Sequence, residues 1–153
     1  MNSEDRYDSL FQYYGDQYDI DWLLLKAQVK AESDFNPDAI SRASAKGLAQ
    51  FMDPTFAEWF DGTPGIQQKE TSSRKLIDVR DPEDAIKAQA AFMSFLLKKY
   101  KGDLPKALAA YNWGMGNLKK WMKAAGKKLP EETENYIKST IEFYKHYQKE
   151  VVV

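Results

Sequence analysis

The sequence contains no cysteine and a single histidine, His146, among its 153 residues. The missing thiols exclude a disulfide framework, a cysteine nucleophile, a zinc finger and an iron–sulfur site. One histidine cannot build a multi-histidine metal site, and no dense Asp/Asn loop of the EF-hand type is present. We therefore predict no metal and no cofactor, and we expect His146 to be a solvated helix residue. If the protein is an enzyme, carboxyl groups must transfer its protons.

Long apolar runs are also missing. The longest, Trp22–Leu25, is far too short to cross a bilayer, so no membrane span is predicted. The polar and acidic N-terminus lacks the basic and apolar regions of a signal peptide. Such a chain is expected either to have lost a signal or to reach its target by another route.

The charge of the chain is nearly balanced, with 22 Lys and Arg against 23 Asp and Glu, which argues against a general nucleic-acid-binding protein. The charges are unevenly distributed. Residues 1–21 hold six acids and one base, whereas residues 96–153 hold twelve lysines and six acids. A basic C-terminal half favours an anionic partner, although a solvated lysine-rich face explains the same pattern.

The strong periodicities are those of helices, and no run of alternating polar and apolar residues predicts a strand. Asp-Pro pairs, as at Asp81-Pro82, predict helix starts. Residues 61–80 have no clear period and are expected to be irregular. The expected helices cover residues 22–33, 54–59, 82–100, 103–111, 117–125 and 130–149.

A chain of this length fits one compact domain. The sequence predicts an all-α single domain of about six to eight helices. Residues 21–150 are expected to form this domain, and residues 1–20 an acidic N-terminal arm or a first helix. As an isolated domain it is expected to be a monomer.

Glu32 falls on the apolar stripe of the helix expected over residues 22–33, three residues after Val29 and in the last turn. Partial burial and the negative end of the helix dipole both disfavour the charged carboxylate, so the pKa of Glu32 should be raised. A carboxyl group that stays protonated near neutral pH is what a general acid requires. The alternative is a boundary residue that reaches solvent or pairs with Lys30 or Arg42.

Four motifs follow one another in order from Glu32 onward. They are Glu32-Ser33 with Asn36-Pro37, Ser41 with Gly47-Leu48-Ala49-Gln50, Ala110-Tyr111-Asn112 before Gly114 and Gly116, and Glu132-Thr133 with Tyr136. Their order and spacing resemble the lysozyme-like catalytic domain of the soluble lytic transglycosylases. The resemblance spans residues 21 to about 147 and implies a lysozyme-like fold that acts on the glycan strands of peptidoglycan.

By this resemblance Glu32 is the single catalytic acid and base. As an acid it would protonate the glycosidic oxygen between N-acetylmuramic acid and N-acetylglucosamine. As a base it would then deprotonate the C6 hydroxyl of the muramic acid, which attacks the anomeric carbon and leaves a 1,6-anhydro sugar. A glycosidase usually needs two carboxyl groups. In the reaction that the resemblance implies, one would suffice, because the nucleophile is a hydroxyl of the substrate itself and is already tethered.

The resemblance also implies a set of substrate-binding residues. They are Ser41, Gln50, Met52, Tyr111, Asn112, Glu132 and Tyr136. For three of them the residues alone leave an alternative open: Ser41 could be a hydroxyl that stabilises its loop, and Met52 and Tyr136 could be core residues. Asn112 is expected mainly to order the turn that follows it.

The sequence departs from the family pattern at two motifs. Ala49 stands where the family has a bulky methionine in its Gly-Leu-Met-Gln turn. Trp113, directly before the Gly-x-Gly segment, and Met115, within it, replace smaller residues of the family and could extend a surface for stacking on sugars. Both departures concern subsite preference more than the reaction.

Two other functions stay open. One is a hydrolytic lysozyme of goose type, in which Asp34, Asp38 or Asp53 would activate a water molecule. The other is a non-catalytic peptidoglycan-binding module or virion component. In every case the expected place of action is the cell wall, in the periplasm or outside the cell. The chain is expected to be a bacteriophage virion or lysis protein, or a domain of a larger protein.

Overall fold

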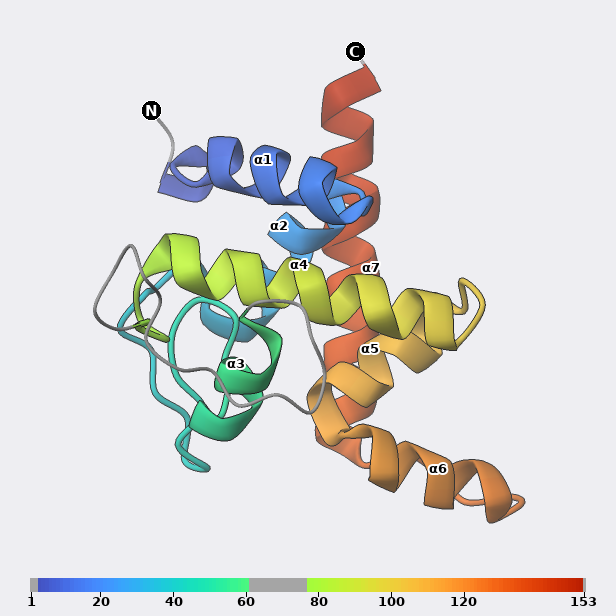
Figure 1. Ribbon diagram of the computed structural model, residues 1–153. Helices are drawn as coiled ribbons and strands as arrows, with labels where there is room; N and C mark the ends of the chain where they lie inside the picture. Colours follow the sequence, from blue (N-terminus) through green and yellow to red (C-terminus); the bar gives the residue numbers. More distant parts are fainter. Residues whose placement is uncertain (1–2, 61–76, 153) are drawn as a thin grey trace.

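The computed structural model describes residues 3–60 and 77–152, and within these ranges it is built of helices without a strand (Figure 1). In these described ranges a short 3-10 helix, Ser3–Asp5, precedes seven α-helices. They are α1 (Asp8–Tyr18), α2 (Trp22–Ser33), α3 (Asp53–Trp59), α4 (Pro82–Lys99), α5 (Leu104–Trp113), α6 (Met115–Lys123) and α7 (Glu131–Val152). The predicted all-α class and the expected number of helices are confirmed. Residues 61–76 of the expected irregular stretch lie outside the described residues.

Side-chain capping defines the starts of three helices. The side chains of Asp21, Asp81 and Asp103 each accept a hydrogen bond from a backbone N–H in the first turn of α2, α4 and α5. The expected break over residues 112–116 is much shorter in the structure, since α5 continues to Trp113 and α6 begins at Met115. Gly114 alone interrupts the helical path, with a φ of 102° that favours glycine.

The acidic N-terminal residues pack against lysines of α2. Lys26 is only 4% exposed, and its Nζ lies 2.6 Å from Asp5 Oδ1 and 3.0 Å from Asp8 Oδ1. Lys30, one turn later, pairs with Glu4. Three of the six acids in residues 1–21 thus face the two lysines of α2.

Replacing Lys26 with methionine should therefore destabilise the protein by about 2 kcal/mol at pH 7, because the partly buried Asp8 loses its cation. Burial raises the pKa of Asp8, so the loss should shrink in acid, where this carboxyl becomes neutral. Urea unfolding at pH 7 and pH 4 measures both values. Lys145→Met, at an exposed position of α7, is the control, and equal losses for the two variants would contradict the assignment.

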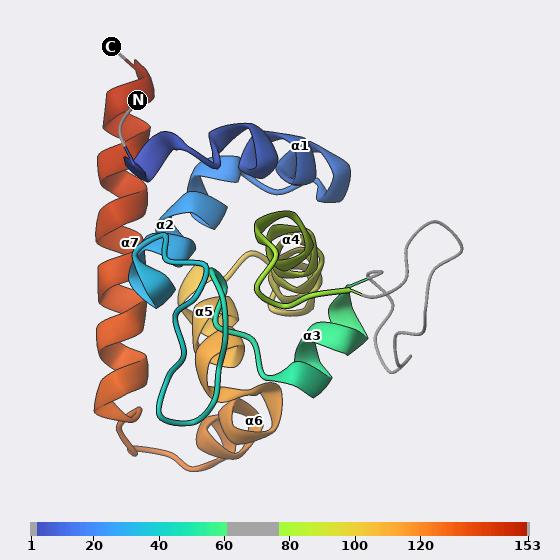
Figure 2. The ribbon, with the colours of Figure 1, turned by 90° about the vertical axis from the view of Figure 1, so that its left-hand side faces the viewer.

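The core is centred on α4, against which α1, α3, α5 and α2 pack. Large buried side chains from several helices fill it, among them Leu25, Trp59, Ile86 and Met93. The long helix α7 packs along α2, and Figure 2 shows it running the length of the molecule, with α6 beyond the lower end of α5. The C-terminal end of α2, the loop that follows it, the end of α5 and the start of α7 thereby meet on one side of the molecule.

Candidate active site

Glu32 lies in the last turn of α2, where the chain leaves the helix abruptly. Asp34 and Phe35 both adopt the left-handed conformation, with φ values of 49° and 64°. Phe35 is 2% exposed and anchors the turn in the core. Glu32 itself is half-buried, so the helix end delivers its carboxyl to the surface of a hollow rather than to open solvent.

Two adjoining cavities, of about 230 and 330 Å³, form a cleft beside Glu32. Five residues line both of them: Glu32, Ser41, Gln50, Asn112 and Glu132. Met52 and Tyr111 line the first cavity, and Tyr136 lines the second. All eight residues singled out in the sequence thus come together, from α2, the loop after it, α5 and α7. Their roles toward a substrate stay predictions.

The electrostatic environment keeps the Glu32 carboxyl neutral. Burial raises its pKa from an ordinary 4.5 to about 8, and the negative charge of Glu132 acts in the same direction. A hydrogen bond with Tyr136 opposes this rise. Lys30, which the sequence offers as an alternative ion-pair partner of Glu32, pairs with Glu4 and Asp34 instead. The protonated form of Glu32 is therefore favoured at neutral pH.

A chain of buried polar side chains supports Glu32 from behind. Tyr136 of α7, which hydrogen-bonds Glu32, accepts a hydrogen bond from Gln28 Nε2 at 3.0 Å. Gln89 of α4 donates through Nε2 to Gln28 Oε1 at 3.0 Å and to the Leu25 carbonyl at 3.1 Å. Gln28 and Gln89 are 1% and 0% exposed. Three helices therefore fix the position of the hydroxyl that faces Glu32, and sequence reasoning identified neither glutamine.

Tyr111 also holds the far wall of the cleft. Its hydroxyl donates to the Ala49 carbonyl at 3.0 Å, and its ring packs against Phe51 and Phe92 at centroid distances of 5.7 and 5.1 Å. Burial raises the pKa of Tyr111 well above its ordinary value, and the charge of Glu32 contributes to that rise. The hydroxyl therefore stays protonated and ties α5 to the turn at residues 47–50.

The polar residues of the loop have structural contacts as well as a place in the cleft. Gln50 Nε2 donates to the carbonyls of Ala39 and Gly47 at 3.1 and 3.0 Å. Ser41 Oγ accepts the Ala45 N–H at 3.0 Å, so its alternative role as a loop hydroxyl is real, while its own O–H can still donate to a ligand.

The exposure of Met52 and Tyr136 shows which of these two side chains packs in the core. Met52 is 44% exposed, which excludes a core-packing role for this side chain. Tyr136 is 7% exposed, so it belongs to the core and lines the cleft at once.

Two hydrogen bonds that sequence reasoning missed hold the walls together. Ser33 Oγ donates to the Leu48 carbonyl at 2.8 Å, which joins the end of α2 to the loop. Thr133 Oγ1 donates to Asn112 Oδ1 at 2.9 Å, which joins α7 to α5. Asn112 therefore does more than order its turn. Ser33 and Thr133 both lie inside the sequence motifs described above, and this position is the one feature of the sequence that could have pointed to their roles.

Gly47 is required where the loop passes close to the segment before α4. Its φ is 79°, and an added Cβ would lie 2.4 Å from the Val79 carbonyl oxygen. Gly47→Ala should therefore cost about 3 kcal/mol in unfolding free energy and distort the cleft. Thermal melting measures the loss. Gly116→Ala, where nothing lies within 4 Å of the added Cβ, is the matched control, and similar melting temperatures for both variants would refute this prediction.

Comparison with known proteins identifies the family. The family model described as "Transglycosylase SLT domain" matches residues 9–134. The chain belongs to this family. Membrane-bound lytic murein transglycosylase F of Alteromonas mediterranea is 33% identical to the SLT domain over 119 residues, and the protein of the same name from Histophilus somni is 34% identical over 120. Each alignment covers 74% of this chain but only 22% and 21% of the relative. The SLT domain thus spans about a fifth of these curated relatives.

Solved structures show the same fold. The SLT domain matches an inactive mutant of the lytic transglycosylase Slt from Pseudomonas aeruginosa with a TM-score of 0.78 and 22% identity, over 96% of this chain and 24% of that one. It matches the 70-kDa soluble lytic transglycosylase from Escherichia coli with a TM-score of 0.74 and 23% identity, over 94% and 25%. The lysozyme-like fold expected from the motifs is therefore confirmed. No helix within residues 3–60 and 77–152 is long and apolar enough to cross a membrane.

Proposed function

We propose that this SLT domain is a peptidoglycan lytic transglycosylase with Glu32 as its single acid and base. It would cleave the β-1,4 bond between N-acetylmuramic acid and N-acetylglucosamine and form 1,6-anhydromuramic acid. One observation carries the proposal: a carboxyl group with a pKa of about 8 lies where the two cavities of the cleft meet. The names of the relatives, lytic murein transglycosylases, support it. The expected place of action is the cell wall.

The proposed reaction returns Glu32 to its starting state. The neutral carboxyl gives its proton to the glycosidic oxygen as the bond from that oxygen to the anomeric carbon breaks, and the N-acetylglucosamine leaves as an alcohol. The C6 hydroxyl then attacks the anomeric carbon, and its proton passes to the Glu32 carboxylate. No water is consumed. The negative charge of Glu132 would stabilise the positive charge that develops on the sugar ring. It also favours the protonated form of Glu32 before the reaction begins.

The other lining residues would bind the strand. The Ser41 hydroxyl and the Gln50 amide oxygen would hydrogen-bond the sugar, while Met52 and the Tyr111 ring would pack against its apolar face. Asn112, Glu132 and Tyr136 would complete the subsites on the α7 side.

The geometry gives little support to the hydrolytic alternative through an aspartate. None of Asp34, Asp38 and Asp53 lines either described cavity, and Asp34 and Asp53 pair with Lys30 and Lys46 at 3.4 and 2.9 Å. Among the described residues, Glu132 is the second carboxyl group that lines the cleft, so a hydrolysis that uses two of these carboxyl groups would proceed through it. A non-catalytic module would have no use for a carboxyl group held neutral in the cleft.

Mass spectrometry of digested peptidoglycan tests the proposal. The expected products are anhydro-muropeptides, each lighter by one water than its hydrolysed counterpart. Asp53→Asn should leave this product pattern unchanged, since Asp53 lies outside both cavities. A digest that contains hydrated products alone would show a lysozyme, and the transglycosylase proposal would fail.

A further inference from the structure

A third hollow lies beside the cleft, between α6 and the segment that leads into α7. It has a volume of about 370 Å³, and we call it the α6 pocket. Two tryptophans and three lysines dominate its lining: Trp113, Trp121, Lys120, Lys127 and Lys128. None of them contributes to the two cavities of the cleft, so the α6 pocket is a separate feature of the surface.

Two hydrogen bonds hold the walls of the α6 pocket in place. The indole N–H of Trp121 donates to the Lys127 carbonyl at 2.8 Å, which closes the end of α6 onto the following segment. Asn117 Nδ2 donates to the Trp113 carbonyl at 2.8 Å, which joins the start of α6 to the end of α5. Both tryptophan rings remain half-exposed and available for contact with a ligand.

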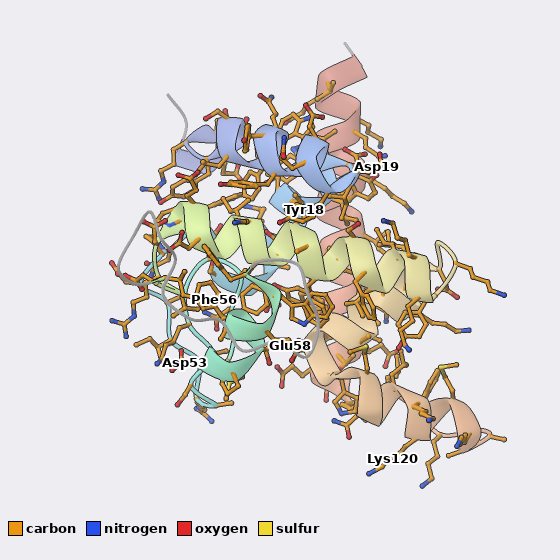
Figure 3. The ribbon with its side chains drawn as sticks, viewed as in Figure 1. Tyr18, Asp19, Asp53, Phe56, Glu58 and Lys120 are labelled. Atoms are coloured by element: carbon orange, nitrogen blue, oxygen red, sulfur yellow. The ribbon has the colours of Figure 1, made fainter. Side chains whose placement is uncertain are left out.

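The charge around the α6 pocket has one sign. Residues 114–130 contain five lysines and no acid. None of the three pocket lysines forms an ion pair with any residue in the described part of the chain, in contrast to Lys26 and Lys30. Lys120 extends from α6 away from the other helices (Figure 3). An anion would therefore meet uncompensated positive charge next to aromatic surface.

Residues that line the α6 pocket are neighbours in sequence of residues that line the cleft. Trp113 directly follows Asn112, and Pro130 of its lining precedes Glu132 by two residues, while Asn112 and Glu132 line both cavities of the cleft. A ligand that fills both places must have a neutral part for the cleft and an anionic part attached to it at short range. The glycan backbone of peptidoglycan is neutral, and its carboxylates lie on the peptides attached to the muramic acid.

We propose that the α6 pocket binds the carboxylates of the peptide attached to the glycan strand in the cleft. This inference rests on the proposed function for its substrate. Lys120, Lys127 and Lys128 supply the charge, and the two tryptophan rings pack against the aliphatic parts of the peptide. The α6 pocket thus makes the SLT domain select strands that carry peptides over strands that have been stripped of them.

Binding in the absence of turnover tests the α6 pocket. In a Glu32→Gln background, the triple variant Lys120→Gln/Lys127→Gln/Lys128→Gln should bind soluble peptide-bearing strands about five- to tenfold more weakly, as expected for three exposed ion pairs. Binding of amidase-stripped strands should change less than twofold. The loss should disappear at high salt. The control, Lys98→Gln/Lys101→Gln/Lys145→Gln, removes the same charge from exposed positions outside the α6 pocket.

Three outcomes would overturn the inference. They are an equal loss for both kinds of strand, an equal loss in the control variant, and binding of a single-stranded oligonucleotide to the α6 pocket as tightly as the peptide-bearing strand. Turnover by the wild-type protein is measured separately. Peptide-dependent binding without turnover would support the role of the α6 pocket and refute the proposed function. Turnover without peptide-dependent binding would support the proposed function and refute the role of the α6 pocket.

Discussion

Glu32→Gln is expected to lower the rate of peptidoglycan cleavage by about a thousandfold or more while the strands still bind. Glutamine keeps the size and shape of the side chain but can neither give a proton to the glycosidic oxygen nor take one from the C6 hydroxyl. The cleft is otherwise lined by side chains that the substitution leaves in place. Release of soluble muropeptides measures turnover, and co-sedimentation with insoluble peptidoglycan measures binding. A variant that lyses as fast as the wild type would refute the mechanism.

The same substitution should stabilise the protein in base and leave it unchanged in acid. The pKa of Glu32 is raised from 4.5 to about 8 on folding, so ionisation opposes the folded state. Below pH 4.5 Glu32 is neutral in the folded and the unfolded protein, and the free energy of unfolding has its full value. It falls as the pH rises toward 8, because Glu32 ionises more readily in the unfolded protein. Glu32→Gln removes this loss and should add about 1 to 3 kcal/mol at pH 8 and nothing at pH 4. Urea unfolding of the wild type and the variant at pH 4 and pH 8 measures the gain in free energy of unfolding. An equal gain at the two pH values would contradict the prediction.

Tyr136→Phe should change both the rate and its pH dependence. Loss of the hydroxyl removes the hydrogen bond to Glu32 and leaves Gln28 Nε2 without its buried acceptor. We expect a fall of about tenfold in kcat, because Glu32 is no longer held in place. Since the lost hydrogen bond lowers the pKa of Glu32, the pH at which activity declines should shift upward. The unpaired Gln28 should also cost about 1 to 2 kcal/mol of stability.

The pH profile of kcat/KM separates these effects from a general weakening of the fold. Tyr144→Phe is the matched control, because its hydroxyl donates to Asp21 at 2.6 Å and Tyr144 lines neither cavity of the cleft. This variant should lose some stability and keep the pH profile of the wild type. If Tyr136→Phe also kept that profile, Tyr136 would be a core residue without influence on Glu32.

The helices could be predicted because their signals are local. Asp21 and Asp81 cap their helices as expected, and the apolar stripes of α2 and α4 form the core. The position of Glu32 follows from the same periodicity. The break predicted over residues 112–116 is too long, because the sequence alone does not distinguish Gly114 from Gly116 as a helix breaker. In the structure Gly116 lies inside α6, and the unusual φ of Gly114 makes the turn.

The support behind Glu32 could not be predicted, because it depends on contacts between distant parts of the chain. Gln28 and Gln89 are 61 residues apart and read as ordinary polar residues of two helices, although both are fully buried. Glu132 was expected to contact the substrate, but its effect on the pKa of Glu32 required the packing of α7 against α2. Likewise, the lysines of residues 114–130 indicate charge, and only the fold shows that three of them, Lys120, Lys127 and Lys128, line a pocket with two tryptophans.

The central claim is that Glu32 stays protonated at neutral pH and so can serve alone as acid and base. Carbon-13 NMR of the protein labelled at the glutamate side-chain carboxyl measures this directly, with the resonance of Glu32 assigned from the spectrum of Glu32→Gln. The midpoint of its titration is expected near pH 8. A midpoint at or below about pH 5, the range of an ordinary exposed glutamate, would contradict the claim.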